Sequence, residues 1–180
     1  DKTPYRGPLD LSTQALNATG AHLLTCGWVY FTNKEKAPEG WDNYPKFAPA
    51  YLESVELPDA AQALDGKEYA IITTGITTPS REVPGKYWNP IIEHVKSKGL
   101  IPVFLGKGKT ITGNATNIHT RWDKDLRFDL GVDLRDQTSL LQAAALIHKA
   151  KLIAGHDNGL LHLAGCTETP IVFGYNLASP

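Results

Sequence analysis

The chain has 180 residues, of which 42% are hydrophobic, and 18 basic residues against 19 acidic ones leave a formal net charge of −1. This composition suffices for an ordinary globular core, and the balanced charge without a long basic run excludes a nucleic-acid polymer as a partner. No apolar run approaches the length of a transmembrane segment, and the two cysteines, Cys26 and Cys166, favour a reducing compartment, so we expect a cytoplasmic protein.

Residues 1–57 differ in composition from the rest of the chain. They are rich in Pro, Gly, Asn and aromatic residues, with an apolar run at 22–31 that predicts one or two strands. Residues 47–55 predict a short helix interrupted at Pro49. We interpret residues 1–57 as an irregular remnant of a preceding domain or a cover, and residues 58–180 as a second domain.

The sequence contains no methionine. We therefore expect a portion of a longer protein, truncated at its C-terminus and preceded by a missing N-terminal domain. Processing of a complete small protein is the alternative interpretation.

A regular pattern begins at Tyr69. Residues 69–72 predict a buried strand, 87–98 a helix, and 101–105 a second strand, with Gly99 as the stop between them. One face of the helix is apolar and comprises Trp88, Ile91, Ile92 and Val95. These elements form a βαβ unit.

The middle of the chain is less regular. Residues 106–124 are rich in loop-forming residues, and a short strand is expected within 128–134. The next helix is predicted at 140–149, because Ser139 and Gln142 have the spacing of a capping box and an apolar face follows them.

The last part of the chain alternates again, with a strand at 151–155, a short helix opening within 157–162, and a strand at 170–174. Strands that alternate with helices through right-handed crossovers predict an α/β fold, a Rossmann-like doubly wound parallel sheet. Ligands of such sheets bind in the crevice at the carboxyl ends of the strands.

Two segments follow strands at this edge and have the chemistry to bind a diphosphate. The first, residues 73–86, offers hydroxyls and cations: Thr77, Thr78, Arg81 and Lys86. The second is the turn Asp157 to His162, where the backbone of Asn158, Gly159 and Leu160 opens a helix whose N–H groups attract anions.

Each of these residues also has a purely structural interpretation. Arg81 and Lys86 alone are typical solvated surface charges. His162 fits a buried imidazole that is hydrogen-bonded to a backbone carbonyl equally well, and Asp157 fits the N-cap of the helix that follows it. The N-cap role and the phosphate-binding role of Asp157 are compatible.

Residues 154–164, which contain Asp157-Asn158-Gly159-Leu160-Leu161-His162-Leu163-Ala164, resemble the Asp-(Ser/Thr)-Gly-x-x-His-Leu-Ala signature of the ADP-heptose:lipopolysaccharide heptosyltransferases, glycosyltransferase family 9. Residues 81–88, ending Lys86-Tyr87-Trp88, are similar to that family's segment with a phosphate-binding lysine. Residues 133–140 are similar to a further passage, so the resemblance spans about residues 69–174.

The resemblance implies that the chain is the C-terminal, donor-binding half of a GT-B enzyme that inverts the anomeric centre and needs no metal ion or other cofactor. The donor is then a nucleoside-diphosphate sugar, and the acceptor a saccharide or glycolipid, through which the protein is expected to act at the inner face of a membrane. The family's acidic catalytic base belongs to the other half, so no catalytic residue is assigned in this chain and it is expected to be inactive alone.

Two departures from the family pattern bear on the donor. Asn158 stands where the family usually has Ser or Thr, and residues 106–110 read Gly-Lys-Gly-Lys-Thr where the family often has an acidic residue for the donor ribose.

Two other functions fit the same residues: a non-catalytic domain that binds a nucleotide or nucleotide sugar, and a GT-B-related nucleotide-sugar epimerase.

Overall fold

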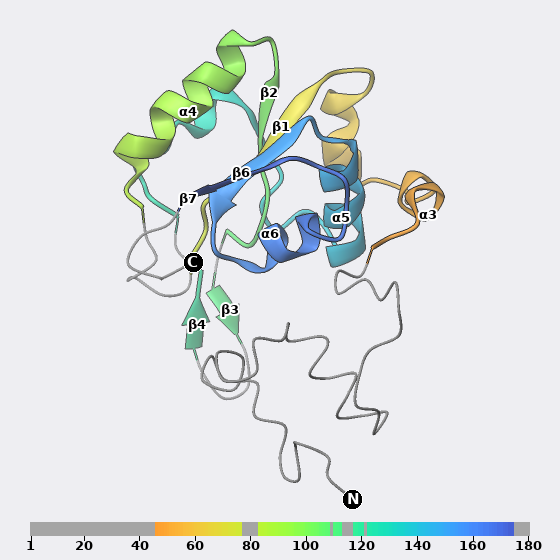
Figure 1. Ribbon diagram of the computed structural model, residues 1–180. Helices are drawn as coiled ribbons and strands as arrows, with labels where there is room; N and C mark the ends of the chain where they lie inside the picture. The colour runs from red at the N-terminus through yellow and green to blue at the C-terminus, as the bar shows by residue number, and fades with distance from the viewer. Residues whose placement is uncertain (1–45, 77–82, 109, 113–116, 121, 175–180) are drawn as a thin grey trace, which may run out of the picture. The chain divides into compact units, whose positions relative to one another are not determined.

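The computed structural model describes residues 46–76, 83–108, 110–112, 117–120 and 122–174. Its main sheet has five parallel strands in the order β5-β2-β1-β6-β7 (Figure 1). The strands are β1 (Tyr69–Thr73), β2 (Ile101–Phe104), β5 (Val132–Asp133), β6 (Leu152–His156) and β7 (Ile171–Gly174). The chain runs outward from β1 in one direction and then from β6 in the other, which is the doubly wound order of a Rossmann-like fold. The predicted fold class is therefore confirmed.

Helices cover both faces of this sheet (Figure 1). On one face, α4 (Gly85–Ser97) packs its Trp88 and Ile92 against Ile72 and Phe104. On the other face, α5 (Leu140–Lys149), α6 (Gly159–Ala164) and a 3-10 helix (Asp59–Leu64) enclose a second apolar cluster, which includes Ile71, Val103, Leu146 and Ile153. Adjacent residues of β1 thus enter opposite cores, because side chains alternate along a strand.

The helix α4 begins two residues earlier than predicted. The carboxylate of Asp123 supplies its cap, since Oδ2 accepts a hydrogen bond from the backbone N–H of Gly85 over 2.5 Å. At the other end, Gly99 adopts the left-handed φ of +81° that terminates many helices, so the predicted stop is confirmed. The early start of α4 depends on a residue 38 positions away, which local sequence does not reveal.

The helix α5 has the predicted bounds. Ser139 Oγ accepts a hydrogen bond from the backbone N–H of Gln142 over 3.2 Å, and the backbone N–H of Ser139 donates to Gln142 Oε1 over 2.9 Å. This reciprocal pair is the predicted capping box, which satisfies donors that a helix start otherwise leaves unpaired.

The segment before the sheet packs on the same unit. The helix α3 (Pro49–Glu53) begins at Pro49, where the missing backbone N–H costs nothing, and buries Leu52 to 1% exposure. The backbone N–H of Phe47 donates to the carbonyl oxygen of Cys166 over 3.0 Å. Residues 1–45, including the strand expected at 22–31, lie outside the described residues, so the division of the chain near residue 57 stays a prediction.

The stretch 106–124, expected to consist of loops, contains an antiparallel pair of strands, β3 (Thr110–Thr112) and β4 (Asn117–His119). Each strand has three residues, which is too short for an alternating pattern to stand out in the sequence. The strand expected within 128–134 has two residues, Val132–Asp133, after a 3-10 turn.

Candidate functional site

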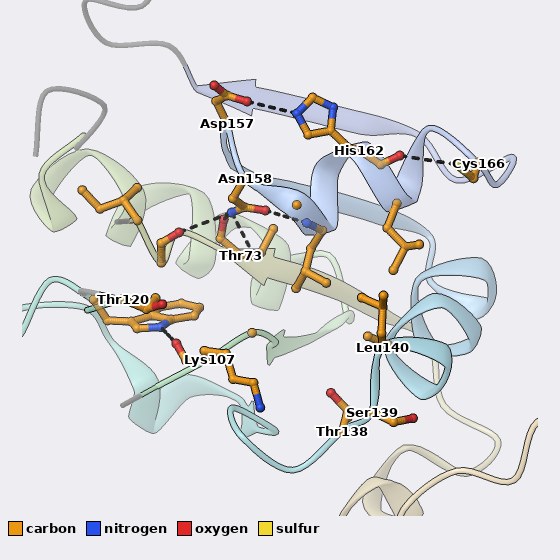
Figure 2. Close-up of a pocket in the computed structure, with 18 residues that line it drawn as sticks. Thr73, Lys107, Thr120, Thr138, Ser139, Leu140, Asp157, Asn158, His162 and Cys166 are labelled. Carbon is orange, nitrogen blue, oxygen red and sulfur yellow. Dashed lines mark hydrogen bonds and ion pairs between the residues drawn. The ribbon is translucent and has the colours of Figure 1, made fainter. Parts of the chain in front are cut away.

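A cavity of about 930 Å³ opens at the carboxyl ends of β1 and β6, the point where the strand order reverses (Figure 2). The end of β1, the loop after β2, the start of α5 and the turn into α6 all line it. Representative lining residues are Thr73, Lys107, Ser139, Asn158 and His162. The size suits a small organic ligand, and ligands of doubly wound sheets bind at this reversal point.

Asn158 organises the β6 side of the cavity. Its Oδ1 accepts hydrogen bonds from the backbone N–H groups of Leu160 (3.0 Å) and Leu161 (3.3 Å), so it is the N-cap of α6. The structural alternative that gave this cap to Asp157 is therefore wrong. The N–H group of Leu160, which we expected to face an anion, is engaged in this cap, and Leu160 lines the cavity beside Gly159.

His162 and Asp157 form a pair at the cavity. His162 Nε2 lies 3.3 Å from Asp157 Oδ1, with the side chains 78% and 27% exposed (Figure 2). The exposure of His162 rules out the alternative of a buried imidazole. Both residues line the cavity and can present a hydrogen-bonding group to a ligand there.

The first predicted segment is described only at its two ends. Thr73, Gly75 and Ile76 line the cavity together with the 157–162 turn, so the start of the segment and the turn meet. Thr77, Thr78 and Arg81 lie outside the described residues. Lys86 lies in the first turn of α4, exposed, with Nζ 4.9 Å from the centre of the Tyr87 ring, and it is not one of the residues that line the cavity.

His156 is a buried residue next to the cavity-lining Asp157 whose contacts the sequence did not reveal. Its ring is 1% exposed, and Nε2 accepts hydrogen bonds from Trp88 Nε1 (2.8 Å) and from the backbone N–H of Val83 (3.1 Å). Nδ1 lies 2.9 Å from the carbonyl oxygen of Thr74. The only signal in the sequence is a histidine directly after the apolar run 151–155.

Trp122 is a second residue that was missed. Its indole Nε1–H donates to the carbonyl oxygen of Lys107 over 2.6 Å, and the Arg135 guanidinium lies 5.0 Å from its ring centre. A Cβ atom built on Gly75 would come within 2.7 Å of this indole, and one built on Gly106 within 3.3 Å. The two glycines therefore make room for an aromatic wall across the ends of β1 and β2.

The pKa of the Asp123 carboxyl is lowered from its ordinary value, because the backbone N–H groups of Gly85 and Asp125 donate to it and favour the charged form.

Within the described part of the chain, no three His, Cys, Asp or Glu residues lie together in a way that could hold a metal ion. None of the helices described there is both long and apolar enough to cross a bilayer.

Fold and cavity together define an α/β protein of the Rossmann-like class with a ligand site at its topological switch point. The sequence places it more closely. Residues 33–180 match the family model of glycosyltransferase family 9 (heptosyltransferase), so the chain belongs to this family.

Solved structures share the fold. E. coli heptosyltransferase WaaC with ADP-2-deoxy-2-fluoro heptose has 18% identity and a TM-score of 0.57, and the match covers 98% of this chain and 50% of WaaC. E. coli ADP-heptose lps heptosyltransferase II has 20% identity and a TM-score of 0.50, over 67% of this chain and 37% of that one. The dodecameric iron-containing heptosyltransferase TibC from enterotoxigenic E. coli, in complex with ADP-D-beta-D-heptose, has 23% identity and a TM-score of 0.50, over 63% and 28%.

This chain therefore spans half or less of the length of each of these solved proteins. No curated protein sequence matches it.

Proposed function

We propose that this chain is the donor-binding portion of an inverting GT-B glycosyltransferase and that it binds a nucleoside-diphosphate sugar in the cavity at the ends of β1 and β6. The observation that carries the proposal is the position of the turn 157–162: the segment that resembles the family signature lines the cavity at the switch point of the sheet. On this side Asp157, Gly159 and His162 are the proposed contacts to the donor, whereas Asn158 and Leu160, whose polar groups are engaged in the cap, shape the cavity wall.

The charges around the cavity suit a diphosphate. Lys107 lines it, and an imidazole N–H of His162, beside Asp157, can donate a hydrogen bond to a phosphate oxygen. Lys86, in the first turn of α4, and Arg81, which precedes it in the sequence, are the further cations proposed for the diphosphate. Asp157 orients the imidazole in this arrangement.

Such a site favours transfer by stabilising the leaving group. When the bond between the sugar and the diphosphate breaks, negative charge accumulates on the nucleoside diphosphate, and preorganised cations and N–H donors stabilise it most strongly at that moment. No metal ion is needed in this scheme. We propose that the base that activates a saccharide or glycolipid acceptor lies in a domain outside this chain, so that the chain alone binds the donor without transferring its sugar.

The ligands of the solved relatives suggest the nucleobase of the donor. WaaC is described with ADP and with a fluorinated ADP-heptose, and TibC with ADP-heptose. We propose an adenosine-diphosphate sugar for this chain. The cytoplasmic location expected from the sequence stays a prediction.

A thermal-shift panel tests the proposal. ADP, GDP, UDP, CMP and their sugar conjugates are added to the wild-type chain and to the variants His162→Ala and His94→Ala. His94 is an exposed histidine on α4 and does not line the cavity, which makes it the matched control.

ADP or an ADP-sugar should raise the melting temperature of the wild-type chain and of His94→Ala, and raise that of His162→Ala by less. Stabilisation by no nucleotide would overturn the proposal. Conversion of a sugar by this chain alone, detected by analysis of the product, would favour the epimerase instead.

A further inference from the structure

The imidazole of His156 joins the end of β6 to both ends of the connection between β1 and α4. Nδ1 lies 2.9 Å from the carbonyl oxygen of Thr74, directly after β1. Nε2 accepts hydrogen bonds from the backbone N–H of Val83 and from Trp88 Nε1, at the other end of the connection. One buried ring thus holds in place Thr74, where the chain leaves the sheet, and Val83 and Trp88, where it enters α4.

The partners of His156 define its protonation. The Thr74 carbonyl only accepts hydrogen bonds, so Nδ1 carries a hydrogen, whereas the indole and backbone N–H groups only donate, so Nε2 carries none. The neutral ring in this tautomer satisfies all of these groups. An apolar side chain of similar size would leave the N–H groups of Trp88 and Val83 without this acceptor.

These contacts lie on both sides of Lys86, a candidate residue for binding phosphate. Val83 and Trp88 lie on either side of Lys86 in the sequence, and Lys86 stands in the first turn of α4 with an exposed side chain. The neighbouring N–H of Gly85 donates to Asp123. The backbone that carries Lys86 is therefore held by side chains from two remote parts of the chain.

We propose that His156 is a positioning residue for Lys86. It acts through Trp88 and Val83 and fixes the first turn of α4, from which the exposed Lys86 side chain would extend to the diphosphate of a bound nucleotide. The edge-on contact between the Trp88 and His156 rings, with centroids 5.0 Å apart, connects β6 to α4. This inference rests on the proposed function.

A double-mutant cycle tests the role of His156. The affinity for ADP is measured by calorimetry for the wild-type chain, His156→Leu, Lys86→Ala and the double variant. His156→Leu should weaken ADP binding about tenfold, the effect of one lost charge-assisted contact. In the Lys86→Ala background the same change should have little further effect, because the ring acts through Lys86, and additive losses would overturn the proposal.

Conservative variants separate positioning from general damage. His156→Gln, which keeps one acceptor and one donor, should recover most of the affinity. Should His156→Leu fail to fold, Trp88→Phe removes one donor to the ring and should weaken ADP binding in the same way. His94→Gln should leave the affinity unchanged, and an equal loss there would overturn the proposal.

A spectroscopic measurement on the wild-type chain is independent of nucleotide binding. Nitrogen-15 NMR of the histidine rings, assigned with His156→Gln, should show His156 neutral with its hydrogen on Nδ1, and the opposite tautomer would overturn the proposal. Absence of ADP binding by the wild-type chain would instead overturn the proposed function. Binding that is unchanged in both His156→Leu and Trp88→Phe would overturn the positioning role alone.

Discussion

The side-chain amide of Asn158 donates a hydrogen bond from Nδ2 to the carbonyl oxygen of Thr73 over 2.9 Å, between residues 85 positions apart in the sequence. The same side chain caps α6 through its Oδ1. Asn158 therefore joins the end of β1 to the start of α6 across the switch point of the sheet. A single amide, with a donor and an acceptor group, fits both tasks at once.

Asn158→Ala should lower the free energy of unfolding by about 1 to 2 kcal/mol, the scale of a lost N-cap. Urea denaturation followed by circular dichroism measures the change. Asn158→Ser is the matched control, because its hydroxyl oxygen keeps an acceptor for the cap and the variant loses the amide donor to Thr73 without placing a second acceptor against that carbonyl. An equal loss in both variants would assign the stabilisation to the contact with Thr73 and not to the cap.

Asp123 predicts a pH dependence of stability. Its pKa is lower in the folded chain because Gly85 and Asp125 donate backbone hydrogen bonds to it. Its contribution is therefore complete above the unfolded pKa, about 4, and is lost as the pH falls through the lower folded value. Asp123→Asn should be less stable than the wild-type chain at neutral pH, and the gap should narrow in acid. A gap that stays constant with pH in urea titrations would contradict this assignment.

The sequence correctly predicted those helix ends that are set by residues close together in the chain. The bounds of α5 follow from Ser139 and Gln142, three residues apart, and the end of α4 follows from Gly99. The predicted order of strands and helices was confirmed because each βα repeat carries its own apolar period.

Contacts between remote residues were not predictable in this way. His156 finds its partners 68 to 82 residues away, and Asp123 finds Gly85 38 residues away. No spacing rule connects such positions, because the fold alone brings them together. For the same reason, Trp122 was not recognised as a wall of the cavity, whereas the turn 157–162, whose residues lie together in sequence, was placed at the strand edge from its pattern.

Gly75→Ala tests the aromatic wall of the cavity. The added Cβ would come within 2.7 Å of Trp122 Nε1, so the indole must move, and its hydrogen bond to Lys107 is strained or lost. We expect a lower melting temperature and weaker ADP binding in this variant. Trp122→Phe provides a comparison, since it removes the hydrogen bond without crowding. Unaltered ADP affinity in both variants would show that the wall does not shape the ligand site.

Gly159→Ala should separate stability from binding. A Cβ atom built on Gly159 meets nothing within 4 Å, and the residue is the first of α6. Gly159 does not have a positive φ, and alanine in place of such a glycine stabilises a protein by about 0.4 to 1 kcal/mol because it restricts the unfolded chain, so the free chain should melt at a higher temperature. If the diphosphate approaches this backbone closely, the methyl group blocks it, and ADP affinity should fall. A rise in both stability and affinity would remove Gly159 from the donor site.

Lys86→Ala should weaken the binding of a nucleoside diphosphate by about 1.5 to 3 kcal/mol, the scale of a lost hydrogen bond to a charged group. The variant should fold as stably as the wild-type chain, because the Lys86 side chain is exposed and its contact with Tyr87 is a weak one. Titration calorimetry with ADP measures the affinity, and thermal denaturation the stability.

The matched control is Lys96→Ala, which removes an exposed lysine from the last turn of the same helix. Both substitutions change the net charge of the chain by the same amount, so any general electrostatic attraction of ADP falls equally in the two variants. A specific contact weakens binding only in Lys86→Ala, and the difference between the variants should persist at high salt, where attraction between distant exposed charges is screened. Equal affinities in the two variants would mean that the cation for the diphosphate is supplied by another residue.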